Sequence, residues 1–266
     1  VGYGTKMGLA PLHTWLPDAH SEAPPTVSAL LSGALLNCAL LGILRALQVC
    51  TAAGQGAFAA ELLTMFGLLS MGLAAVFMIR QPEYKRLLAY SSVEHMGIIA
   101  VGIGVGSAGA LLHIAAHSFT KGMLFLLAGN ILLATKSREV NEAQGILRRL
   151  PLTGALWLAG FLALTGTPPF GTFVSEFAIA QAAFGQGRVL VGGLYLALLA
   201  LAFIALADIF LRMAYGKDEG EAQPEPRLAV VPALGLGLLV LLLGIWLPPG
   251  LAALFAAAAR DLGGLL

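Results

Sequence analysis

Three residues that can carry protons, His113, His117 and Lys121, follow one another at intervals of four residues in an apolar stretch. Residues four apart lie on the same face of an α-helix, so this spacing predicts a single stripe of titratable side chains. A neutral imidazole accepts a proton on one ring nitrogen and releases one from the other, which suits the stripe to relaying protons. A polar seam that only fixes helix packing is the alternative, but Ser or Asn would serve there at lower cost, and we favour the relay.

Zinc binding is the weaker interpretation of the same stripe. Two histidines four residues apart can hold zinc, but no HExxH glutamate accompanies them, and Lys121 would be a poor third ligand. Cys38 and Cys50 lie on one predicted helix, about 18 Å apart along its axis, so they predict neither a disulfide nor a thiolate site. We therefore expect no cofactor or metal in this chain.

Other ionisable residues also fall in apolar stretches, where each costs several kcal/mol unless it is paired or hydrated. Lys6 precedes Pro11, and Glu176 follows the pair Pro168-Pro169. Helices interrupted at membrane depth are typical of ion sites in transporters. Neither charge lies at the end of a predicted span, where long side chains snorkel, so we expect both to belong to a proton pathway.

Glu94, His95 and Asn37 each have two interpretations. Glu94 and His95 could admit protons from the cytoplasmic side or form an ordinary interhelical pair. Asn37 could continue a hydrated pathway or hydrogen-bond between packed helices. Asp208 and Arg212, four residues apart near a span end, are expected to pair with each other.

The composition places the chain in the membrane class. Of its 266 residues, 58% are hydrophobic and 11% are charged, and the mean hydropathy is +0.87. These values exclude a soluble globular domain and a disordered chain. The formal net charge of +1 provides no basic field for nucleic acid, and the sequence has no GxSxG, P-loop or CxxC motif.

Apolar stretches of about 20 residues predict an all-α polytopic membrane protein with about eight transmembrane helices. The stretches lie near 1–17, 25–49, 57–79, 84–106, 108–135, 150–185, 188–214 and 228–247. Two of them are expected to be discontinuous, those near 1–17 and 150–185, because proline interrupts each.

The charged loops predict how often the 150–185 stretch crosses the membrane. A single crossing places ten Lys and Arg residues on one side and three on the other, whereas two crossings give eight and five. The stronger asymmetry favours one broken span with the basic loops in the cytoplasm.

Four motifs in order resemble the antiporter-like membrane subunits of respiratory complex I (chains L, M and N). This family also includes Mrp-type cation/proton antiporters and the membrane arms of energy-converting hydrogenases. The motifs are Gly4–Lys6 with Pro11–His20, Tyr84–Ser92, His113 with His117–Lys121, and Gly166–Phe170 with Ser175–Phe177. Within the family, Ser91–Gly97 and Ser28–Asn37 look most like the F-type subunit of hydrogenase-4 and formate hydrogenlyase-like complexes.

The resemblance implies two inverted five-helix repeats, each with one discontinuous helix. Residues 1–49 would end the first repeat, 57–214 would form the second, and 228–266 would add a C-terminal helix and tail. We expect the chain to be a fragment of a longer subunit, because no charged segment or cleavage site precedes its first apolar stretch.

The resemblance also implies a pathway. Its members would be Lys6, His113, His117, Lys121 and Glu176. Where chains M and N carry a further lysine, this sequence has Asn37.

The expected function is proton translocation in a membrane-bound hydrogenase or NADH-dehydrogenase-like oxidoreductase of a prokaryotic cytoplasmic (inner) membrane. Its partners would be other membrane-arm subunits and a hydrophilic redox arm that carries iron-sulfur clusters and a nickel-iron centre. Two alternatives stay open. One is an Mrp-type Na⁺/H⁺ antiporter component without a redox partner, and the other is a membrane scaffold that moves no protons.

Overall fold

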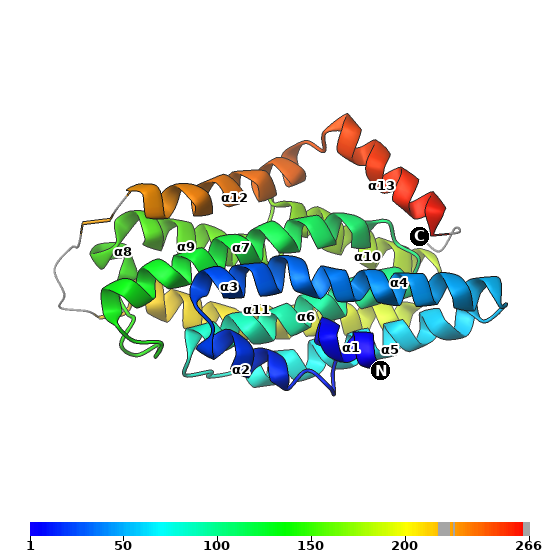
Figure 1. Cartoon of the computed structure of the whole chain (residues 1–266), viewed down its shortest axis with the longest axis horizontal. Helices are drawn as coiled ribbons and strands as arrows, with labels where there is room; N and C mark the ends of the chain where they lie inside the picture. The colour runs from blue at the N-terminus through cyan, green and yellow to red at the C-terminus, as the bar shows by residue number, and fades with distance from the viewer. Residues whose placement is uncertain (218–223, 226, 263–266) are drawn as a thin grey trace.

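The computed structural model describes residues 1–217, 224–225 and 227–262. These residues form an elongated bundle in which most helices run along the long axis (Figure 1). In chain order the helices are α1 (Gly2–Met7), α2 (Trp15–Glu22), α3 (Pro25–Leu30), the π-helical turn η1 (Leu31–Leu35), α4 (Leu36–Ala52), α5 (Gly56–Met78), α6 (Tyr84–Gly104), α7 (Gly109–Thr135), α8 (Ile146–Arg149), α9 (Pro151–Leu164), α10 (Gly171–Gly185), α11 (Val189–Tyr215), α12 (Arg227–Ile245) and α13 (Pro249–Asp261).

Six helical segments of the described chain are long and apolar enough to cross a membrane. They are Pro25–Ala52, Gly56–Met78, Tyr84–Gly104, Gly109–Thr135, Val189–Tyr215 and Arg227–Ile245. The first of these joins α3, η1 and α4 without a gap. The predicted all-α polytopic membrane fold is confirmed. The two segments predicted to be interrupted are described next.

The second predicted interruption lies at residues 165–170, between α9 and α10. Beside the start of α9, the backbone N–H of Leu152 donates to Glu225, 2.8 Å away. Just beyond the end of α10, Gln186 Nε2 donates to the carbonyl of Val105, 2.6 Å away. α9 and α10 follow one another along the long axis of the bundle (Figure 1), so together they cross it once, as the loop charges predict.

The first predicted interruption separates α1 from α2. Gly8 follows the last residue of α1, and its φ of 84° is in the left-handed region that favours glycine. The backbone N–H of Ala10 then donates to Ser70 Oγ of α5, 2.9 Å away, which holds the interruption against the bundle. α2 continues beyond the predicted end at residue 17, because Pro17 lies in its first turn, where a missing N–H is tolerated.

α6 forms the centre of the bundle, and 94% of the residues in its apolar stretch are buried. It contacts α5 closely at two glycines. A Cβ atom on Gly67 would lie 2.7 Å from the carbonyl oxygen of Gly97. A Cβ atom on Gly97 would likewise lie 2.7 Å from the carbonyl oxygen of Gly67. The absence of side chains at both positions therefore sets how near these helices approach.

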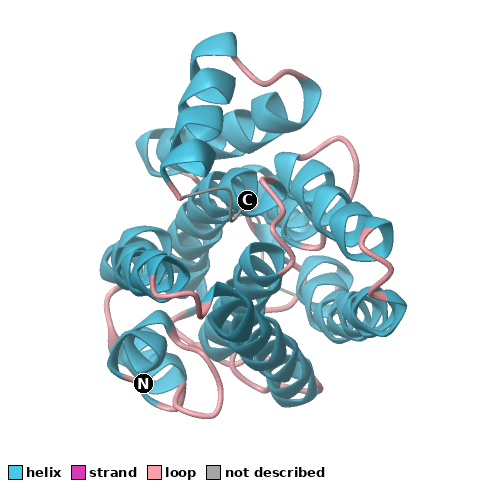
Figure 2. Ribbon diagram, turned by 90° about the vertical axis from the view of Figure 1, so that its right-hand side faces the viewer, coloured by secondary structure: helices cyan, strands magenta, loops and turns pink. Residues whose placement is uncertain are grey.

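α12 and α13 lie along the upper side of the bundle in both views (Figures 1 and 2). α13 was not expected, since the sequence predicts only a tail after residue 247. Pro249 occupies the first turn of this helix, where proline is favoured. Leu251 and Phe255 pack near Leu112 and Ala116 of α7, so α13 covers part of the helix that carries the histidine stripe.

Candidate functional site

Three fully buried imidazoles meet where α6 and α7 pack together. His95 of α6 lies against both His113 and His117 of α7, with ring centroids 5.0 and 5.1 Å apart. His95 Nδ1 and His113 Nε2 are 2.8 Å apart, which is hydrogen-bond distance. We call these three residues the histidine cluster. The predicted stripe on α7 therefore exists, and α6 completes it with a third imidazole.

Neighbouring groups fix which ring nitrogens of the cluster carry protons. Ser175 Oγ donates to the carbonyl of Thr172, 2.8 Å away, and its remaining capacity is to accept. His113 Nδ1, 2.8 Å from Ser175 Oγ, is then the donor to it. A neutral His113 therefore accepts at Nε2 from His95 Nδ1, and His95 Nε2 is left free to receive a proton.

Two carboxylates flank the histidine cluster. Glu94 Oε2 lies 3.9 Å from His95 Nε2. Glu176 of α10 is also buried, and one of its carboxylate oxygens lies within 4.8 Å of a ring nitrogen of His95 and of a ring nitrogen of His113. Gly166 makes room for Glu176, because a Cβ atom there would overlap the carboxylate. The break between α9 and α10 thus admits an acidic group into the bundle centre.

Lys121 lies at the other end of the stripe on α7, about 12 Å from His113 at 1.5 Å rise per residue. Its Nζ is fully buried and donates to the carbonyl of Leu88, 3.0 Å away, and to Ser91 Oγ. Ser91 belongs to α6, so Lys121 and the histidine cluster both join α6 to α7.

The two ambiguous polar positions lie close to the cluster. Glu94 and His95 are buried at the middle of α6, where His95 contacts α7, as the interhelical interpretation predicts. A role for the pair in admitting protons stays a prediction. Asn37 Nδ2 donates to Ser118 Oγ of α7, 2.7 Å away, and to the carbonyl of Gly33, 2.9 Å away. Asn37 thus hydrogen-bonds between packed helices, beside the stripe.

The structure does not bring Lys6 into the cluster. Lys6 is exposed, and its Nζ lies 5.0 Å from the centroid of the Trp15 ring. Trp15 Nε1 donates to the carbonyl of Thr5, 2.7 Å away, which fixes the ring beside α1. Lys6 lines a cavity of about 880 Å³ between α1, α4 and α5. Its place in a proton pathway stays a prediction.

A metal could be held by one group in the described chain, formed by His95, His113 and Glu176. This group differs from the zinc site considered on His113 and His117, because it includes His113 but not His117, and its other two members come from α6 and α10. His95 and His113 also hydrogen-bond to each other, and this arrangement can carry protons without an ion.

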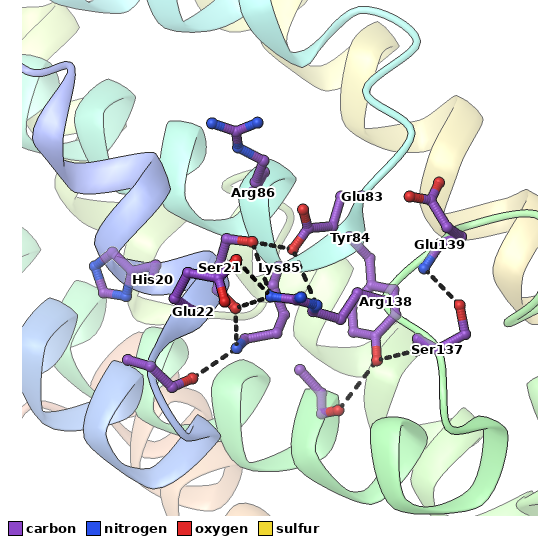
Figure 3. A network of polar contacts seen from close by, with 12 residues as sticks. His20, Ser21, Glu22, Glu83, Tyr84, Lys85, Arg86, Ser137, Arg138 and Glu139 are labelled. Atoms are coloured by element: carbon purple, nitrogen blue, oxygen red, sulfur yellow. Dashed lines mark hydrogen bonds and ion pairs between the residues drawn. The ribbon is translucent and has the colours of Figure 1, made fainter.

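The fold brings to this region several polar residues for which the sequence patterns predict no function. Ser91 and Ser175 lie in motifs that carry the family resemblance, and both contact members of the site. His20 and Lys85 lie in the same motifs, at the end of the bundle that carries the basic loops (Figure 3). The motifs marked these residues, but only the packing of the helices shows what they contact.

Residues 1–205 match the family described as NADH:quinone oxidoreductase/Mrp antiporter, TM. The chain belongs to this family of antiporter-like membrane subunits.

Two proteins and one solved structure are similar to this chain over most of its length. The chain is 40% identical over 253 residues to a hydrogenase-4 component F homolog of Methylacidiphilum infernorum, covering 94% of this chain and 53% of that protein. It is 33% identical over 261 residues to NAD(P)H-quinone oxidoreductase chain 4 of a Synechococcus species, covering 90% of this chain and 47% of that one. A subunit of the archaeal membrane-bound sulfane sulfur reductase has a TM-score of 0.88 and 26% identity, covering 100% of this chain and 56% of that one. The predicted family and its hydrogenase-4 branch are confirmed, and the chain spans about half the length of these relatives.

Proposed function

We propose that this chain is the proton-translocating part of an antiporter-like membrane subunit in a membrane-bound hydrogenase or NADH-dehydrogenase-like complex. The observation that carries the proposal is the series of buried polar groups that runs from Lys121 through the histidine cluster to Glu176. Lys121 receives a proton, the imidazoles pass it along, and Glu176 exchanges it with one side of the membrane. Electron transfer in partner subunits drives the cycle by changing the electric field at Lys6.

Water completes this series in the proposed mechanism. Both ring nitrogens of His117 and the Nε2 atom of His95 are buried without a hydrogen-bond partner among the described residues. Buried polar groups are normally paired, and ordered water is a common partner. We expect water to connect His117 with Lys121 on one side and with His95 on the other.

The chemistry of the donors favours protons over Na⁺. The histidine cluster and Lys121 supply nitrogen atoms, whereas hard cations prefer several oxygen ligands. This argument supports the redox-driven proton pathway over the Mrp-type Na⁺/H⁺ alternative.

The relatives support assembly into a larger complex. Their names include hydrogenase-4 component F and NAD(P)H-quinone oxidoreductase chain 4. In the proposal, other membrane-arm subunits adjoin this chain, and a hydrophilic redox arm carries the iron-sulfur clusters and the nickel-iron centre. The complex lies in the cytoplasmic (inner) membrane of a prokaryote, with the basic loops 80–86 and 135–149 in the cytoplasm.

The test is Lys121→Met in the full-length protein, within its complex in sealed vesicles. Methionine keeps the length of the side chain and removes the group that carries the proton. Vesicle acidification, followed with a pH-sensitive dye, should fall by about a hundredfold, a typical contribution of one positioned proton-transfer group. Electron transfer should continue in uncoupled vesicles.

The matched control is Lys217→Met, which makes the same change at an exposed position beyond the end of α11. It should pump as the unaltered protein does. Undiminished pumping by Lys121→Met would reject the relay and support the scaffold alternative. A dependence of acidification on Na⁺ would instead support the antiporter alternative.

A further inference from the structure

His20 occupies a position between the basic end of the bundle and Lys121. Its ring stacks on Phe125 of α7, with centroids 4.9 Å apart and planes at 13°. Phe125 follows Lys121 by four residues, so it lies on the same face of α7 one turn nearer the basic end. His20 is fully buried, and neither of its ring nitrogens has a hydrogen-bond partner among the described residues.

Lys85 lies beside the chain just after His20, since its ammonium group contacts the carbonyl of Ser21. The ammonium groups of Lys85 and Lys121 are both close enough to act electrostatically on the imidazole. Lys85 is 1% exposed. Its Nζ donates to the carbonyls of Ser21 and Ala23, 2.7 Å away in each case, so it closes the end of α2 just beyond His20 (Figure 3).

Polar contacts continue from Ser21 to the surface. Ser21 Oγ donates to the carboxylate of Glu83. Arg138 Nη1 donates to the carbonyl of Ser21, 2.7 Å away, and to Glu22 Oε1, 3.0 Å away (Figure 3). The Glu22 side chain is 77% exposed. Titratable groups therefore extend from solvent at Glu22 to the buried ring of His20.

Packing alone does not account for a histidine at this position. A phenylalanine would stack on Phe125 equally well and would bury no unpaired nitrogen. An imidazole with two unpaired nitrogens near two lysines is suited to a different task. It can accept a proton on one side and release it on the other.

We propose that His20 is the proton-transfer site that connects Lys85 at the basic end with Lys121 in the series described above. This inference rests on the proposed function, since it supplies the route by which protons reach Lys121. The route runs from the surface at Glu22, past Lys85, through the His20 ring to Lys121, and then to the histidine cluster.

Two variants of His20 in the full-length complex in vesicles test the proposal. His20→Phe preserves the stack on Phe125 and removes the nitrogens, and His20→Ala leaves space for an added ring. Both should lower the rate of acidification by about a hundredfold while uncoupled electron transfer continues. Added imidazole should restore acidification in His20→Ala but not in His20→Phe.

Pyrrole is the matched probe, because it has the same shape and cannot accept a proton on a ring nitrogen. Equal recovery with pyrrole and imidazole would show that His20 only fills space, and would overturn the proposal. The control variant is His13→Phe, a second buried histidine that lies 6.2 Å from Phe77 and 6.3 Å from Tyr90 between ring centroids, and it should pump normally.

Comparison with Lys121→Met separates the two proposals. Normal pumping by His20→Phe together with failure of Lys121→Met would overturn the assignment of His20 and leave the relay intact. Normal pumping by both variants would overturn the proposed function as well.

Discussion

His113 hydrogen-bonds at both ring nitrogens, and its contact with Ser175 sets the direction of the whole cluster. Ser175 Oγ uses its proton on the carbonyl of Thr172, so His113 Nδ1 must donate to Ser175. His113 Nε2 then accepts from His95 Nδ1, 2.8 Å away. A proton that arrives at His95 Nε2 can displace the one on Nδ1 toward His113, so the cluster is prepared to pass protons from α6 to α7.

Ser175→Ala should slow translocation, because it removes the acceptor that fixes the protonated nitrogen of His113. Loss of one such hydrogen bond, about 1.4 kcal/mol, corresponds to about a tenfold lower rate of vesicle acidification. Assembly and uncoupled electron transfer should be unchanged. Ser175→Thr keeps the hydroxyl and should retain most of the rate, and an equal loss in both variants would show that helix packing at this position, not the hydroxyl, is responsible.

Gly166→Ala should destabilise the subunit and displace Glu176. Gly166 has a φ of 58°, and a Cβ atom there would overlap the Glu176 carboxylate. Strain of this kind costs about 1 to 3 kcal/mol. The apparent unfolding midpoint of the purified complex should fall and acidification should be lost. Gly185→Ala, on the same helix as Glu176, meets nothing within 4 Å and should leave both unchanged.

Gly67→Ala should separate α5 from α6. The added Cβ would lie 2.7 Å from the carbonyl oxygen of Gly97, closer than packed atoms allow. Forcing an extra methyl into a packed interior costs about 1 to 3 kcal/mol, so the apparent unfolding midpoint of the complex should fall. The control on the same helix is Gly72→Ala, whose nearest neighbour would be Leu198 at 3.6 Å. A midpoint unchanged by Gly67→Ala would mean that the helices can move apart at no cost.

Local patterns predicted the framework of the site. The four-residue spacing of His113, His117 and Lys121 needs only a regular helix, which α7 provides. The interruption before Glu176 follows from glycine and proline in its own segment, and the single crossing follows from charges in the loops. Each of these features depends on residues near one another in the sequence.

The contacts between helices could not be predicted in the same way. Nothing local in the sequence states that His95 faces His113, that Ser175 sets its protonated nitrogen, or that the ring of His20 meets Phe125. These pairs depend on how far α2, α6, α7 and α10 are rotated and how closely they approach. Glycines such as Gly67 control that approach, and their effect is visible only when both partners are placed.

Lys6 could act in two ways, as a fixed positive charge or as a group that releases its proton. It is exposed beside Trp15, with Nζ 5.0 Å from the ring centroid, and arginine can make the same cation-π contact. Arginine keeps the charge but does not release its proton in proteins. If Lys6 belongs to the proton pathway, as its sequence position predicts, Lys6→Arg should assemble normally and lower acidification by about a hundredfold. Lys217→Arg, at an exposed position beyond α11, should have no effect. Normal pumping by Lys6→Arg would mean that Lys6 acts through its charge alone, and that the protons handled by Lys121 do not pass through it.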